Sequence, residues 1–416
     1  MVYQPPSGAR DLLPLDVAQK SWIEDRLQQV LHRWGYHRII TSTLERMDTL
    51  MAGGAIASQQ ILQIQTSSDE VLGLRPEFTA SIARTAVMRL SDKSYPSRLY
   101  YNANVFRRPQ EGSHSTQQES YQAGVELLGG GGVLADAEIL LLVMDCLNGI
   151  GLADRWQMVL GDAGLTRSLL WEFPKPLRGK VRHALAHLDR VALETIPMEE
   201  DLRSRALQIL DLRGEPDAVI KKLSQMPLDD YQQRAALNLQ RLLSLLQATA
   251  QKRGLPDRFP IVLDLSLIRT FDYYTGIVFE VIGDPASGQQ ILGQGGRYDE
   301  LLSTYHPQSE SIPSIGFSLE IERLHQALLP TGQLPKRTTT SEKLVVAESV
   351  EVYPIALAQS QILRELNPSS QIEIYLRSPD GTATIDRETI YDHARQQSII
   401  EIVWIRANGS IDVEML

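Results

Sequence analysis

The sequence predicts an α+β fold in which antiparallel hairpins are interleaved with helices and a small α/β domain follows. Three observations predict it. Up to about residue 150, strand-like runs alternate with amphipathic stretches as hairpins do, without the regular strand–helix–strand alternation of a doubly wound sheet. Four helical periodicities then fill about residues 165–255 and indicate a helical insertion. Finally, the Pro/Thr-rich segment LPTGQLPKRTTTSE separates the rest of the chain from a short C-terminal region.

The first expected element is a helix over residues 15–34, where apolar residues recur at helical spacing. Asp16 can cap its start, and Gly35 ends it. The next segment, RIITSTLE at residues 38–45, is rich in β-branched residues and is expected to form a short strand.

The rest of the region before the insertion is expected to hold further strands and two helices. An amphipathic helix is predicted between Glu77 and Leu90, and Asp136 is expected to cap another helix that runs through Leu147. The strands are predicted at residues 71–75, 98–106 and 121–128.

Strands return after the insertion in PIVLDLSLI, YTGIVFEVIG and QILGQGGRY, and their pairing with the earlier strands would complete one sheet. A strand followed by a helix is expected in SIGFSLEIERLHQALL. The expected organisation is therefore a first domain over 1–328, a linker over 329–342 and a small α/β domain over 343–416.

Composition narrows the class of protein. With 416 residues, the chain is too long for one ordinary compact domain. Its net charge of −10, and the excess of twelve acidic over six basic side chains from Thr338 onward, argue against a nucleic-acid partner. The absence of a long apolar run and of a basic-then-apolar leader predicts a cytoplasmic protein without a membrane partner.

Metal, cofactor and common catalytic motifs are missing from the sequence. The lone Cys146 excludes an intrachain disulfide and a cysteine metal cluster. The eight histidines are scattered, and no HExxH or Ser/His/Asp spacing stands out. We therefore expect no metal, no cofactor and no catalytic residue.

Three polar side chains at the ends of predicted elements are candidates for ligand binding. Glu77 and Thr79 lie where a strand gives way to a helix, and together they can accept hydrogen bonds from an ammonium group. The alternative is that they only cap that helix. Arg107 ends a strand, where it can bind a carboxylate or phosphate or form an ordinary surface ion pair.

The strand YQAGVELLG places Gln122, Gly124 and Glu126 on one face of the sheet, because strand side chains alternate. That face is therefore either solvated or the floor of a polar pocket.

Two later segments carry further candidates. IRTFDYYTGIVFEV offers Arg269 together with Tyr273 and Tyr274, whose rings suit a planar ligand or an aromatic turn. LGQGGRYDELL has glycines that permit close backbone approach. Arg323, at the start of the helix in GFSLEIERL, is either directed at a phosphate or solvated.

These motifs, together with SGARDLLP near the N-terminus, occur in the order found in the catalytic domain of the histidyl-tRNA synthetase family, which the chain resembles over residues 5–328. The resemblance implies the class II aminoacyl-tRNA synthetase fold, an antiparallel sheet flanked by helices that usually dimerises. The C-terminal region is loosely similar in its element order to an anticodon-binding domain.

The resemblance also implies a complete histidine pocket. The positions that match ligands of the α-ammonium group are Glu77, Thr79 and Gln122. Those that match residues around the imidazole are Glu126, Tyr273 and Tyr274. Those that match the arginines near the carboxylate or the α-phosphate are Arg107 and Arg269. Arg323 would be a remnant directed at phosphate.

The departures from the synthetase pattern concern the nucleotide. After FRRPQ the chain carries SHSTQQES, where the synthetases carry arginines that meet the triphosphate, and a proline of the dimer interface is replaced at about Ser42. This combination resembles a related family, the regulatory subunits of ATP phosphoribosyltransferase. It implies a partner, the short-form catalytic chain, and feedback regulation by L-histidine. The alternative is an active histidine–tRNA ligase.

Overall fold

The computed structural model describes residues 4–54, 56–65, 70–90, 95–109, 117–254, 260–267, 273–284, 290–338, 340–376 and 386–416. The chain divides into two compact units. The first comprises Met1–Leu13 and Gln19–Leu334, and the second comprises Pro14–Ala18 and Pro335–Leu416.

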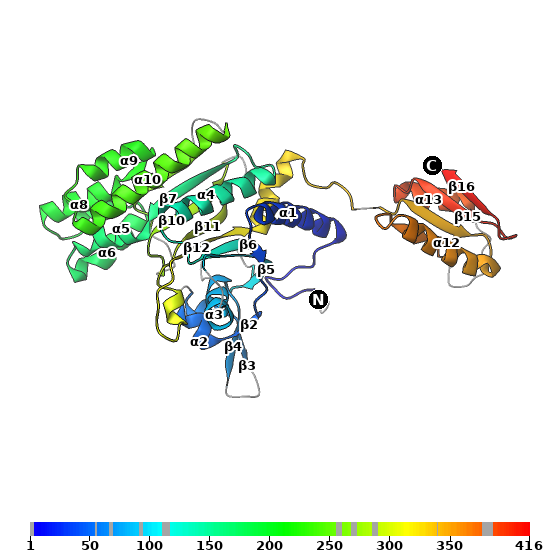
Figure 1. Ribbon diagram of the computed structural model, residues 1–416, viewed down its shortest axis with the longest axis horizontal. Coiled ribbons are helices and arrows are strands. Elements are labelled where there is room, and N and C mark those ends of the chain that lie inside the picture. The colour runs from blue at the N-terminus through cyan, green and yellow to red at the C-terminus, as the bar shows by residue number, and fades with distance from the viewer. Residues whose placement is uncertain are drawn as a thin grey trace. The chain divides into compact units, whose positions relative to one another are not determined.

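The first unit is built on a nine-stranded sheet with the order β1-β5-β6-β12-β11-β10-β7-β9-β8 (Figure 1). Its strands are β1 (His37–Arg38), β5 (Ser97–Phe106), β6 (Glu119–Leu128), β7 (Trp156–Asp162), β8 (Arg213–Gly214), β9 (Ile261–Asp264), β10 (Ile277–Gly283), β11 (Ile291–Arg297) and β12 (Ser314–Glu320). A separate small sheet has the order β2-β4-β3, from β2 (Leu44–Arg46), β3 (Gln63–Gln65) and β4 (Val71–Leu74).

Helices cover both faces of the large sheet (Figure 1). The helices before the insertion are α1 (Pro14–Arg33), α2 (Met47–Ala52), α3 (Thr79–Arg89) and α4 (Gly132–Gly149), and α11 (Ile321–Leu328) follows β12. The helices between β7 and β9 are α5 (Ala163–Trp171), α6 (Lys175–Ala186), α7 (Arg190–Thr195), α8 (Glu200–Leu210), α9 (Pro216–Ser224) and α10 (Asp230–Arg253). This arrangement confirms the predicted α+β fold class.

The alternation along β6 separates two hydrophobic cores. Ala123, Val125 and Leu127 enter the core that includes α1, α4 and the helices of the insertion. Leu128 belongs to the second core, beside α3. Gln122 and Glu126 are offset from the first set by one residue, so they face the α3 side of the sheet.

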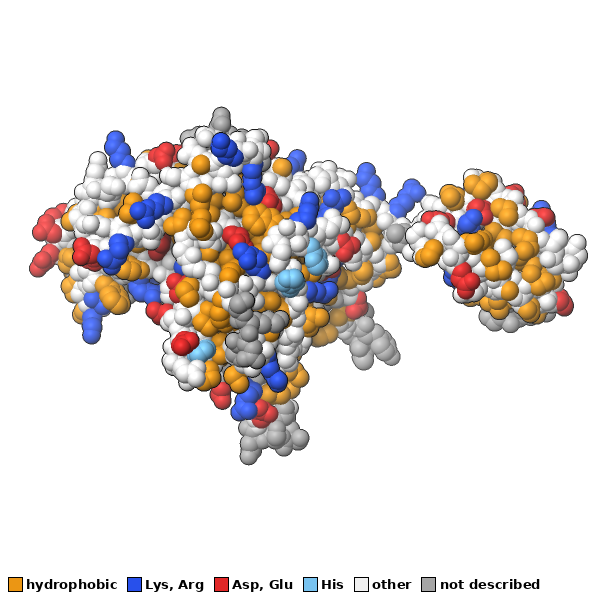
Figure 2. Space-filling view, viewed as in Figure 1, with side chains coloured by type: hydrophobic (Ala, Val, Ile, Leu, Met, Phe, Trp, Pro, Cys, Tyr) orange, Lys and Arg blue, Asp and Glu red, His pale blue; other side chains and the backbone are white. Residues whose placement is uncertain are grey.

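The second unit is a four-stranded sheet with the order β14-β13-β15-β16 and a helix on each face. Its elements are β13 (Lys343–Ala347), α12 (Tyr353–Leu366), β14 (Ile372–Ile374), α13 (Arg387–Gln396), β15 (Glu401–Ile405) and β16 (Ile411–Met415). The face of the molecule in Figure 2 shows basic and acidic side chains interspersed on the first unit, without one continuous basic stripe.

Three local predictions were wrong. The strand expected at residues 38–45 is two short strands in different sheets, because the carbonyls of Thr41 and Ser42 accept hydrogen bonds from the Arg75 guanidinium instead of from a neighbouring strand. Asp136 does not cap α4, which begins at Gly132; it lies inside the helix and binds Arg297.

The third error concerns the start of the N-terminal helix. Helix α1 begins at Pro14, so Asp16 lies in its first turn and not at its cap. In the large sheet, β1 pairs in parallel with β5 and β7 pairs in parallel with β9, so the sheet is mixed although its central pairs are antiparallel.

Candidate functional site

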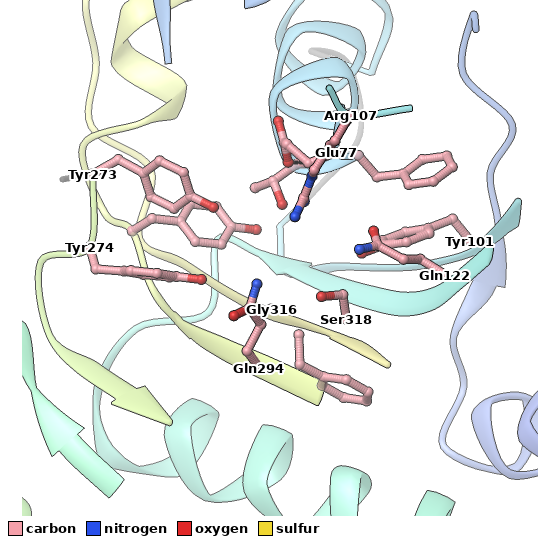
Figure 3. A pocket seen from close by; sticks show the side chains of 13 residues that line it. Glu77, Tyr101, Arg107, Gln122, Tyr273, Tyr274, Gln294, Gly316 and Ser318 are labelled. Carbon is pink, nitrogen blue, oxygen red and sulfur yellow. Dashed lines mark hydrogen bonds between the residues drawn. The ribbon is translucent and has the colours of Figure 1, made fainter. Parts of the chain in front are cut away.

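A pocket opens on the α3 face of the large sheet (Figure 3). Strands β6, β11 and β12 form its floor, and the start of α3, the residue after β5 and the segment before β10 form its walls. The lining residues are Glu77, Phe78, Thr79, Tyr101, Arg107, Gln122, Tyr273, Tyr274, Gln294, Tyr298, Gly316, Phe317 and Ser318.

Glu77 combines the two roles considered for it, because it lines the pocket and also caps α3. Its buried carboxylate accepts hydrogen bonds from the backbone N–H groups of Thr79 and Ala80, the latter at 2.8 Å. Burial raises the pKa of Glu77, while these hydrogen bonds and the Arg107 guanidinium act to lower it. Arg107 is held in place by its Nε, which donates to the Pro76 carbonyl at 2.7 Å.

Glu126 lies beneath the pocket surface with both carboxylate oxygens bound. The Thr79 hydroxyl donates to its Oε1 at 2.7 Å, and the Tyr298 hydroxyl donates to its Oε2. The side chain is only 1% exposed, and burial raises the pKa of Glu126 to about 8, with a smaller increase from Glu77. Near neutral pH the carboxyl group is therefore largely protonated when the pocket is empty.

Tyr273 and Tyr274 form one wall of the pocket, opposite Gln122 and Tyr101 (Figure 3). The rings of Tyr273 and Tyr274 lie 4.7 Å apart, and that of Tyr298 lies 5.8 Å from Tyr273. Gln122 is buried and fixed by its Nε2, which donates to Glu320 Oε1 at 2.7 Å. An apolar aromatic wall thus meets acidic, amide and guanidinium groups, an arrangement suited to an amino acid with a planar side chain.

The predicted site residues separate into four groups. Six of them line the pocket: Glu77, Thr79, Arg107, Gln122, Tyr273 and Tyr274. Glu126 supports it from below. Arg269 lies outside the described residues, as do Ser113 to Thr116 of the loop after Arg107. Arg323 is exposed, is not among the lining residues, and donates to the Ile291 carbonyl at 2.9 Å.

Sequence reasoning missed Tyr101, Gln294, Tyr298 and Ser318, which also line the pocket. A signal for Tyr298 was present, because it lies in LGQGGRYDELL, two residues after the last glycine of that motif. A glycine at 316 is needed for the same network, since a β-carbon there would collide with the Glu126 carboxylate. The pairing of β12 with β6 places Gly316 opposite Glu126, and this pairing could not be predicted from the sequence.

The described residues contain no group of three or more His, Cys, Asp or Glu side chains that could hold a metal ion. Among the helices in the described parts of the chain, none is long and apolar enough to cross a membrane.

The mixed sheet and this pocket define a domain of the histidyl-tRNA synthetase type. A family model described as histidyl-tRNA synthetase matches residues 8–324. A solved structure described as an ATP phosphoribosyltransferase regulatory subunit/histidyl-tRNA synthetase from Bacillus halodurans has a TM-score of 0.80 at 26% identity, covering 98% of this chain and 99% of the other. The histidyl-tRNA synthetase of Nostoc sp. PCC 7120 shares the fold, with a TM-score of 0.76 at 20% identity over 99% of this chain and 97% of that one.

Full-length relatives are more similar still. The ATP phosphoribosyltransferase regulatory subunit of Nostoc punctiforme is 56% identical over 416 residues and covers 100% of both chains. That of Nostoc sp. strain PCC 7120 is 57% identical over 414 residues, covering 100% of this chain and 99% of the other. The chain belongs to the family of ATP phosphoribosyltransferase regulatory subunits, as its sequence predicted.

Proposed function

We propose that this chain is a regulatory subunit without catalytic activity of its own and that it assembles with the short-form catalytic chain of ATP phosphoribosyltransferase. The complex performs the first step of histidine biosynthesis, and L-histidine bound in the pocket regulates it. The observation that carries the proposal is a pocket whose lining combines acidic, amide, guanidinium and aromatic groups. The proposal is supported by the sequence SHSTQQES, which lacks the arginines expected at a triphosphate site.

The pocket offers a partner for each part of histidine. Glu77, Thr79 and Gln122 supply acceptors for the ammonium group, and Arg107 supplies a cation for the carboxylate. Tyr273 and Tyr274 provide flat walls for the ring. An imidazole N–H can replace one of the two hydroxyl donors to Glu126. The Glu126 carboxyl group can therefore recognise the ring through a hydrogen bond.

The loop argues against adenylation. Hydrogen bonds to charged groups contribute about 1.5–3 kcal/mol each. Two arginines missing from a triphosphate site would therefore weaken ATP binding by roughly two to four decades, since about 1.4 kcal/mol corresponds to a factor of ten. The neutral residues Gln117 and Gln118 in the described part of the loop cannot replace that charge. The alternative, an active histidine–tRNA ligase, would require the remaining arginines to suffice.

Self-association as a dimer belongs to the same proposal, because the synthetase fold usually dimerises. A role without nucleic acid is supported by the net charge of −10 and by the interspersed charges in Figure 2.

Calorimetric titration of the full chain tests the proposal, first with histidine and then with ATP and Mg²⁺. Histidine binding without detectable ATP binding is the expected result. Tight binding of both, with pyrophosphate exchange into ATP, would favour the ligase instead, and binding of neither would refute a histidine pocket in the isolated chain. Added catalytic chain should co-elute with this one in gel filtration.

A matched pair of threonine variants on α3 makes the titration specific. Thr79→Val removes the hydroxyl proposed to accept a hydrogen bond from the ammonium group of histidine, and it should weaken histidine binding by about tenfold or more. Thr85→Val removes a hydroxyl that only bonds the helix carbonyl of Ser81, so it should leave binding unchanged. Equal effects of the two variants would place histidine elsewhere.

A further inference from the structure

A second and larger cavity lies between α10 and one end of the large sheet. The end of β7, the start of β10, the end of β11 and the start of α4 border it. It adjoins the first pocket along two short segments of chain. Tyr274 lines the first pocket and Thr275 the second, and Tyr298 lines the first while Arg297 and Asp299 line the second.

The acidic side chains that line this cavity outnumber the basic ones. Arg297 forms ion pairs with Asp136 at 2.7 Å and with Asp299 at 2.9 Å, which leaves Asp162 as the third carboxylate of the lining. Within the described residues, no ion pair includes Asp162. Among the described residues, the other guanidinium of the lining belongs to Arg234, an exposed residue of α10.

Asp162 is buried at the cavity wall, with 8% of its surface exposed. One of its oxygens, Oδ1, accepts the Leu165 backbone N–H at 2.8 Å and so caps α5. Burial, with a contribution from Asp136, raises the pKa of Asp162 to about 6. The backbone N–H groups of Leu165 and Gly164 and the Arg297 guanidinium act to lower that pKa. A cation that enters the cavity would add to this stabilisation of the ionised carboxylate, because burying a charge without enough counter-charge is costly.

Most of the remaining wall belongs to α10, which contributes the polar Tyr231 and Asn238 together with an apolar strip. Ala235, Leu239 and Leu242 recur at helical spacing on the face of α10 that lines the cavity, and Ile277 of β10 and Val133 of α4 line it as well. A ligand that fits both parts carries a positive charge at one end and an apolar body at the other.

We propose that this cavity is a second small-molecule site, which binds an organic cation with its ammonium group on Asp162 and its apolar body against Leu239 and Leu242. The site is separate from the pocket proposed for histidine and does not depend on that proposal.

Two probes of the same shape test the site on the full-length chain. Benzylamine carries the required ammonium group and apolar ring, and benzyl alcohol is its neutral counterpart. In titrations followed by saturation-transfer NMR at neutral pH, benzylamine should bind saturably, and benzyl alcohol should bind about tenfold more weakly or worse. Equal binding of both probes, or no saturable binding of benzylamine, would overturn the proposal.

The variants are chosen so that the fold is preserved. Asp162→Asn removes the charge but keeps an acceptor for the α5 cap, and it should weaken benzylamine binding by about tenfold. Asn238→Trp, on an exposed position of α10 in the lining, should obstruct the cavity and have a similar effect. The control Asp229→Asn, at the cap of α10 and outside the lining, should bind benzylamine as the wild type does.

A comparison with the first pocket separates the two proposals. Thr79→Val should leave benzylamine binding intact, and Asp162→Asn should leave histidine binding intact. Benzylamine binding that survives Asp162→Asn but is lost in Thr79→Val would place the amine in the first pocket and refute the second site.

Discussion

Replacing Glu126 by glutamine should remove a pH dependence from the stability of the ligand-free chain. Burial raises the pKa of Glu126 to about 8 from an ordinary value of 4.5. The folded chain therefore keeps a proton that the unfolded chain has already released. The stabilisation from this proton is complete below pH 4.5 and is lost as the pH rises through about 8.

The size of the effect follows from the same shift. Each pH unit over which only the folded state holds the proton costs about 1.4 kcal/mol of unfolding free energy. Between about pH 6 and about pH 8, where the group is half titrated, the wild type should lose about 2 kcal/mol that Glu126→Gln does not lose. The amide keeps polar atoms facing the hydroxyls of Thr79 and Tyr298, so the network is retained.

Urea unfolding of both proteins at these two pH values measures the difference. Other buried carboxyl groups also titrate, so the quantity that decides is the change in wild type minus the change in the variant. Glu200→Gln, at an exposed position of α8, controls for the altered net charge. Parallel pH dependences in the wild type and Glu126→Gln would show that Glu126 does not hold the extra proton.

Two further predictions concern the second cavity. Arg297→Ala leaves the buried Asp136 without its cation and should destabilise the chain by about 3–5 kcal/mol in urea unfolding, whereas a loss below about 1 kcal/mol would mean that the pair is not coupled as described. Because the two cavities share adjoining segments, saturating benzylamine should change the dissociation constant of histidine. Histidine should then change the dissociation constant of benzylamine by the same factor. Identical histidine titrations with and without benzylamine would show that the cavities are independent.

Local patterns predicted those parts of the site that depend on local geometry. The alternation along β6 placed Gln122 and Glu126 on one face, and the structure brings Gln122 into the pocket on that face. The chemistry of the adjacent Tyr273 and Tyr274 suited either a planar ligand or an aromatic turn, and it was the resemblance to the synthetases that assigned them to the pocket, which both of them line.

Long-range partners could not be predicted in this way. Asp136 was expected to cap a helix because capping is a local motif, but its partner Arg297 lies 161 residues away and reaches it only through the sheet. Tyr298 was missed for the same reason, since it donates to a carboxylate 172 residues away. The split of the strand near Ser42 likewise depends on Arg75, a side chain 33 residues further along.

The first pocket is hydrogen-bonded internally before a ligand arrives, which determines how it can discriminate. A ligand that only exchanges one hydrogen bond for another gains little, so affinity must come from pairing its charges with Glu77 and Arg107 and from contact with the tyrosine rings. Under the proposed function, selectivity for histidine comes from Glu126, whose donors an imidazole N–H can replace. If the displaced donor is Tyr298, the exchange acts directly on the end of β11 and on the neighbouring Arg297. Under the proposed function, a change of hydrogen-bond donor beneath the pocket is thus converted into a change at the end of the sheet. If the free energy of this exchange differs between two states of the complex, that difference is the coupling free energy on which feedback regulation rests.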